Sequence, residues 1–127
     1  MINFLAVFLG GGLGSVTRYA LGLAIKKMGF MAPLATLTSN VFASALLLGL
    51  LATYTTQSGD ALKSNPWLLL WTVGFCGAFS TFSTFAADTI SLLHSHGALW
   101  SIGNIAINVI SCIAIGWWIW SAMQAVN

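Results

Sequence analysis

The sequence predicts an all-α membrane protein with four transmembrane helices in each subunit. Of its 127 residues, 58% are hydrophobic and only 5% are charged, whereas a soluble domain carries about 25% charged residues. The apolar residues also gather in four runs, each close to the roughly 20 residues that cross the hydrocarbon of a bilayer. These runs predict spans at about 2–25, 33–55, 67–93 and 98–123, which together form a single transmembrane domain in a lipid bilayer.

Composition also excludes several classes of function. Four basic and two acidic residues cannot form the Lys/Arg patch that nucleic-acid binding needs. No nucleophile–base pair or cluster of metal ligands stands out, so an enzyme is not expected. Cys76 and Cys112 lie inside predicted spans and have no Cys or His neighbours at ligand spacing. We interpret both as small packing residues.

The first span starts at Ile2 without a basic segment before it and is too long for a signal-peptide core, so we expect it to be retained. Gly10 and Gly14 form a GxxxG pair, which favours close approach of another helix. Arg18 lies in the last third of this span and allows two interpretations. Its side chain either reaches the membrane surface, or faces an aqueous vestibule and concentrates anions there.

Polar residues stand just inside the start of the second span, where Asn40 follows Thr36, Thr38 and Ser39. The Asn40 amide can donate two hydrogen bonds, which a halide could accept. It could equally bond a neighbouring helix. Both interpretations stay open. A polar connection follows at 55–65, and then Pro66, at a position where helices commonly begin.

The third span contains the most unusual segment, GFCGAFSTFSTF at 74–85. Its glycines and hydroxyl residues are unsuited to an uninterrupted helix, and broken backbone at membrane depth lines a cavity or is buried in protein. We predict a break at 77–80 and an ion site beside it. Phenylalanines recur at every third position, and they either pack or present their positive ring edges to an anion. Carbonyl oxygens freed by the break would suit a hard cation such as Na⁺.

The end of the third span and the start of the fourth are less informative. Asp88 follows Phe85 by one turn and either caps the polar track or lies near the membrane surface. His94 and His96 are expected to be ordinary residues of a short loop, which makes the third and fourth spans antiparallel neighbours.

A polar stripe runs along the fourth span. Asn104, Asn108, Cys112 and Gly116 are spaced four residues apart, so they share one helix face. Intramembrane polar groups are costly when they face lipid. This stripe must therefore face protein or water, where its donors could replace the water around an ion.

Lys/Arg counts set membrane orientation, and here they are almost balanced. Lys26 and Lys27 lie on one side, and Lys63 and the terminal amine on the other. We therefore expect insertion in both orientations, which permits antiparallel dimers. A chain this small also has little interior of its own, so a homo-oligomer is the natural way to enclose a pathway.

Taken together, these motifs closely resemble the Fluc (CrcB) fluoride channels over essentially the whole chain. The segment at 74–85 is the most specific of them. GGGLGSVTRY at 10–19, TLTSN at 36–40 and the Asn104/Asn108 stripe support the resemblance.

The resemblance implies an antiparallel, dual-topology homodimer with two separate fluoride pores in the bacterial inner membrane. It also implies a structural Na⁺ that is not transported, held by the backbone carbonyls of Gly77 and Ser80 from both subunits. Passive efflux would protect the cell against fluoride. With Arg18 as the vestibule candidate, the fluoride pathway would comprise Phe82, Phe85, Asn40, Ser83, Thr84, Asn104 and Asn108.

The sequence leaves two alternatives to a channel. A small proton-coupled multidrug exporter also uses four short helices in antiparallel dimers, but its chemistry needs a carboxylate early in the chain. The first span offers only Arg18 as a charged intramembrane residue. A structural subunit of a larger complex would leave the polar stripe and the glycine-containing aromatic segment without explanation.

Overall fold

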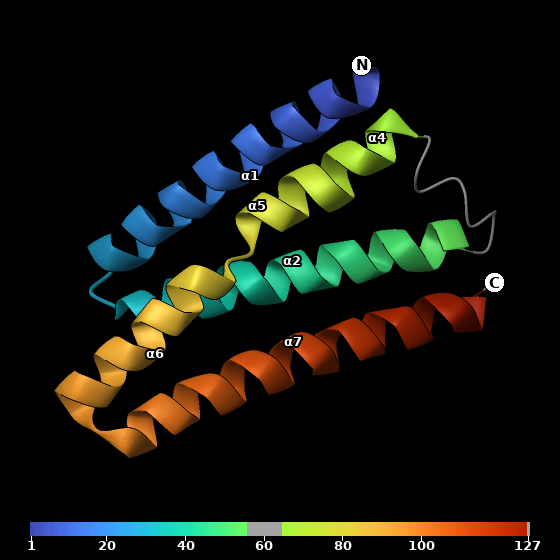
Figure 1. Ribbon diagram of the computed structural model, residues 1–127. Coiled ribbons are helices and arrows are strands. Elements are labelled where there is room, and N and C mark those ends of the chain that lie inside the picture. Colours follow the sequence, from blue (N-terminus) through green and yellow to red (C-terminus); the bar gives the residue numbers. More distant parts are fainter. Residues whose placement is uncertain (56–64, 127) are drawn as a thin grey trace.

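A computed structural model describes residues 1–55 and 65–126 of the chain. Most of the predicted second connection, including Lys63, lies outside the described residues. The described chain folds into four helical spans, each long and apolar enough to cross a membrane, which confirms the predicted fold class. Consecutive spans run in alternating directions (Figure 1). The helices are α1 (Ile2–Lys27), α2 (Ala32–Thr55), α4 (Pro66–Leu69), η1 (Leu70–Cys76), α5 (Gly77–Phe79), α6 (Phe82–His96) and α7 (Ala98–Val126).

Two glycines allow the tight connections between spans. Gly29 follows α1 with φ 81°, and Gly97 alone joins α6 to α7 with φ 91°. A positive φ of this kind is open to glycine without strain. Because α6 continues to His96, His94 and His96 belong to its last turn. The expectation that these histidines lie in a loop is therefore wrong.

The third span begins at Asn65, whose side-chain oxygen accepts a hydrogen bond from the Trp67 N–H at 3.0 Å. After one α-helical turn the backbone widens into the π-helix η1. Here α1 and η1 approach so closely that a Cβ atom on Gly10 would clash with the Leu70 carbonyl. A Cβ atom on Gly14 would clash with the Phe75 carbonyl. The GxxxG pair therefore serves close helix packing, as predicted.

The third span is broken at Ser80 and Thr81. Both residues are extended, with ψ 157° at Ser80 and φ −154° at Thr81. Gly77 remains helical, with φ −63° and ψ −34°. The break thus exists, overlaps the predicted segment 77–80 at Ser80 and extends one residue further, to Thr81. It also changes the neighbours of the span, because η1 and α5 pack against α1 whereas α6 packs against α7 (Figure 1).

The break separates the phenylalanines that the triplet spacing had grouped on one face. Phe79 is buried in a cluster with Ala43 and Cys76, whereas Phe82, just beyond the break, is 80% exposed. Phe79 and Phe82 therefore do not share a face of one continuous helix. Cys76 is a buried free thiol in this cluster, consistent with a packing role.

We expect Gly14→Ala to destabilise the fold, because the added methyl would meet backbone atoms that cannot move aside. Overpacking of this kind costs about 1–3 kcal/mol. Gly12→Ala is the matched control, since nothing lies within 4 Å of its Cβ position. Thermal unfolding in detergent measures both variants. Equal stability of the two would show that the α1–η1 contact does not require glycine.

Candidate functional site

The break exposes backbone groups that helix hydrogen bonds no longer satisfy. Contacts of Thr81 satisfy two of these backbone N–H groups. The Thr81 N–H donates to the Asn40 side-chain oxygen at 2.8 Å. Its own hydroxyl oxygen accepts the Thr84 N–H at 3.2 Å and so caps the start of α6.

Asn40 connects three helices at this point. Its oxygen serves Thr81, while its Nδ2 donates to the Asn108 Oδ1 on α7 at 3.0 Å. A second contact of Nδ2, to the Thr81 carbonyl at 3.5 Å, is at the limit of a hydrogen bond. Of the two interpretations left open, the observed contacts fit the interhelical one.

Asn108 is the polar residue with an unmet donor. Its side chain is only 4% exposed. Its Nδ2 is buried without a hydrogen-bond partner among the described residues. A buried donor left unpaired costs about 1–3 kcal/mol. This donor therefore calls for an acceptor from outside the described residues, such as a water molecule or a bound ion.

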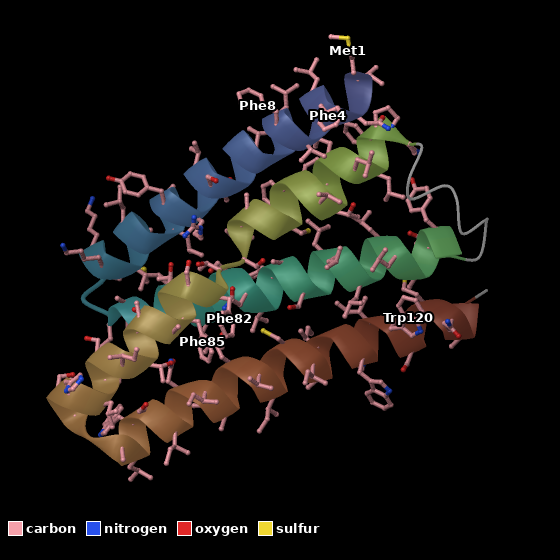
Figure 2. All side chains as sticks on the ribbon, in the orientation of Figure 1. Met1, Phe4, Phe8, Phe82, Phe85 and Trp120 are labelled. Atoms are coloured by element: carbon pink, nitrogen blue, oxygen red, sulfur yellow. The ribbon has the colours of Figure 1, made fainter. Side chains whose placement is uncertain are left out.

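A cavity of about 350 Å³ lies beside this amide. The Phe82 and Phe85 rings border it, with their centroids 5.6 Å apart and their planes at 54°. Figure 2 shows both rings where α6 approaches α2 and α7. The structure thus brings together four of the predicted fluoride-pathway residues, and the predicted cation ligand Ser80, in this aromatic cavity. Its lining includes Asn40, Ser80, Thr81, Phe82, Phe85 and Asn108.

A larger cavity of about 630 Å³ lies on the other side of the break. Arg18, Lys26 and Thr84 line this basic cavity, and Thr81 borders both cavities. No acidic side chain is among the described residues that line it. Arg18 also donates from Nε to the Ala78 carbonyl at 3.1 Å. The side chain of Arg18 therefore lines this partly open cavity and also contacts the third span.

Two of the predicted pathway residues, Ser83 and Asn104, line neither of these two cavities. Asn104 donates to the Thr89 hydroxyl at 2.8 Å and lines a third, mostly apolar cavity of about 450 Å³. Ser83 is exposed, and its hydroxyl lies 3.3 Å from that of Thr81. It borders none of the three cavities. The stripe on α7 faces protein at Asn104 and Asn108, but these residues border different spaces.

Asp88 has a hydrogen-bond partner that neither interpretation of the sequence predicted. Its Oδ2 accepts a hydrogen bond from the Thr36 hydroxyl at 2.6 Å. Thr36 is 5% exposed, so this contact ties α6 to the start of α2. Two hydroxyl–carboxyl partners 52 positions apart carry no local sequence signal.

The two carbonyls proposed as cation ligands are also freed by the break. No hydrogen bond to the Gly77 or Ser80 carbonyl oxygen is found within residues 1–55 and 65–126. Nothing in this part of the chain lies within 4 Å of a Cβ position on Gly77, so this face is open. Unpaired carbonyls at the end of a half-helix suit a hard cation, so the residues present fit Na⁺.

Sequence reasoning missed the central position of Thr81. It caps α6, binds Asn40 through its N–H and borders both cavities. A hydroxyl residue directly before a new helix is a recognisable N-cap signal. Locating the break one or two residues later would have revealed it.

Comparison with known proteins identifies the family of this chain. The chain is 40% identical to the "Fluoride-specific ion channel FluC" of Enterobacter sp. (strain 638) over 126 residues, which is 95% of each chain. It is 35% identical to the proteins of the same name from Klebsiella pneumoniae (strain 342) and Escherichia coli (strain K12), over 91% and 95% of each chain. Residues 5–120 match the family described as "CrcB-like protein, Camphor Resistance (CrcB)", and the chain belongs to this family.

Proposed function

We propose that this multi-pass bacterial membrane protein is a fluoride channel that lets fluoride leave the cell passively. The observation that carries the proposal is the unpaired, buried Asn108 Nδ2 beside the Phe82 and Phe85 rings. Relatives of this chain that are named fluoride-specific ion channels support the choice of ion. Fluoride that enters as neutral HF ionises inside, and a passive exit for the anion would protect the cytoplasm.

The aromatic cavity offers an anion neutral partners in place of water. The Asn108 amide supplies an N–H donor, and phenyl ring edges carry partial positive charge. The cavity also lies at the start of α6, where first-turn N–H groups and the helix dipole favour an anion. These groups attract an anion without a fixed charge that would hold it too tightly to leave.

The basic cavity supplies the approach to this region. Arg18 and Lys26 both line it, and no acidic side chain among the described residues does. A cleft lined by one sign of charge raises the local concentration of the opposite ion. Thr81 and Thr84 line this cavity next to the break and contribute hydroxyl-bearing side chains to it.

The working unit is an antiparallel homodimer with two pores. Asn40 and Asn108 border a cavity at membrane depth, and polar groups there must be shielded from lipid by protein or water. A second copy would supply that cover, and the open face at Gly77 offers a place for its backbone. The nearly balanced Lys/Arg distribution permits the antiparallel arrangement.

A structural Na⁺ fits the carbonyls of Gly77 and Ser80, contributed by both subunits. Neither oxygen has a donor in the described chain. When bound, the ion would offset the negative ends of the two α5 helices and link the subunits at their breaks. Ser80 contributes through its main chain, because its hydroxyl donates to the Cys76 carbonyl at 2.9 Å.

Liposomes that contain the purified protein are expected to release fluoride rapidly down its gradient while they retain chloride. Ion-selective electrodes measure both ions. Equal release of the two would contradict selectivity, and release of neither would favour a structural subunit. Release that requires an imposed proton gradient would favour the multidrug-type exporter.

We expect Asn108→Asp to lower fluoride flux about 10- to 100-fold. The substitution keeps the oxygen that accepts from Asn40 but replaces the free donor, and hydrogen bonds to charged groups contribute roughly 1.5–3 kcal/mol. Ser111→Ala changes a polar residue on the same helix outside the three cavities and is the control. Wild-type flux in Asn108→Asp would contradict a direct role for this amide.

Phe82→Ile and Phe85→Ile are expected to lower fluoride flux and leave dimer assembly intact, since isoleucine fills space but has no ring edge. Phe8→Ile, at a position 76% exposed on α1, serves as the control. Flux assays and size-exclusion chromatography measure the two properties separately. Unchanged flux in both variants would refute the role of the rings.

A further inference from the structure

Arg18 makes a contact that its role as a cavity cation does not explain. Its Nε donates to the carbonyl of Ala78, which is 60 positions away in the chain. In a continuous helix that carbonyl would accept the N–H of Phe82. The break at Ser80 and Thr81 removes this bond. Arg18 therefore replaces a backbone hydrogen bond that the third span gives up.

The close packing of α1 prepares this contact. Gly14 lies one turn before Arg18, and a Cβ atom on it would stand 3.2 Å from the Ala78 Cβ. Without a side chain at Gly14, α1 comes close enough to α5 for Arg18 to reach its last turn. A cation at a helix C-terminus also interacts favourably with the helix dipole.

The hydrogen-bond donors of Arg18 are divided between two tasks. The Nε–H binds Ala78, while the side chain also lines the basic cavity. A guanidinium carries five N–H donors in a rigid plane and does not lose its proton in proteins. The Nε–H can therefore bind the Ala78 carbonyl while the other N–H groups remain available to water or an anion.

We propose that Arg18 is a positioning residue for the broken span. By holding the Ala78 carbonyl, it fixes the last turn of α5, next to the Gly77 and Ser80 carbonyls. The same contact sets where Thr81 and α6 begin. Its effect on ion flow rests on the proposed function, but its effect on Ala78 does not.

Two substitutions separate the contact from the charge. In Arg18→Gln the side-chain nitrogen stands at the same bond count from Cα as the arginine Nε, so the donor is kept and the charge is lost. In Arg18→Lys a methylene occupies that place, so the charge is kept and the donor is displaced. Arg18→Met removes both. Lys27→Gln removes an exposed charge near the end of α1, outside the basic cavity, and is the control.

The direct readout is the Ala78 carbonyl itself. Ala78-Phe79 is the one Ala-Phe pair in the sequence, so labelling with carbonyl-¹³C alanine and ¹⁵N phenylalanine selects this carbonyl in NMR spectra of the reconstituted protein. We expect its resonance to shift in Arg18→Lys and Arg18→Met and to stay close to the wild-type position in Arg18→Gln and Lys27→Gln. An unshifted resonance in Arg18→Met would overturn the proposal.

Fluoride flux gives the second readout. If the contact matters for conduction, Arg18→Gln conducts about tenfold faster than Arg18→Lys, as expected for one hydrogen bond to a charged group. The reverse order would assign Arg18 to charge alone and overturn the positioning role. If the wild-type protein conducts no fluoride, the proposed function fails, and the Ala78 resonance still decides the inference. Size-exclusion chromatography confirms that each variant is folded before it is compared.

Discussion

One constraint governs the molecule: backbone polar groups at membrane depth must find partners within protein. The break at Ser80 and Thr81 interrupts the backbone hydrogen bonds of the third span. Side chains from other helices bind backbone groups that the break exposes. Asn40 accepts the Thr81 N–H, and Arg18 donates to the Ala78 carbonyl. These two contacts come from α2 and α1. The geometry of the broken span therefore depends on side chains from neighbouring helices as well as on its own sequence.

Packing explains why the span must break. Its first half lies against α1, at a distance that only glycine backbones allow at Gly10 and Gly14. Its second half lies against α7. A straight helix could not keep both neighbours, and the change of direction opens space on either side of Thr81. Thr81, at the break, lines both the basic and the aromatic cavity.

Local rules predicted the four spans, a break in the third and a polar stripe that faces protein, because hydropathy and periodicity act over short stretches. They placed the break at 77–80, which meets the observed break only at Ser80, because its position also depends on Asn40, 41 positions away from Thr81. They also grouped Phe79 with Phe82, and placed Asn104 beside Asn108. Spacing reports a shared face only along an unbroken helix, and it does not report which cavity a helix turn meets. The Thr36–Asp88 hydrogen bond was missed for the same long-range reason.

Charged side chains and neutral hydrogen-bond donors line different cavities, and this separation suits the conduction of an anion. Arg18 and Lys26 border the wide cavity, whereas the aromatic cavity has an amide and ring edges but no charged lining residue among those described. A fixed charge in the smaller cavity would bind an anion strongly and slow its departure, while conduction needs binding that is favourable yet weak. The break makes this division possible. It presents the carbonyl end of α5 and the N–H end of α6 within two residues of each other, and these ends favour ions of opposite sign. One interruption can thus serve an anion on one side and, in the arrangement proposed above, a structural cation on the other.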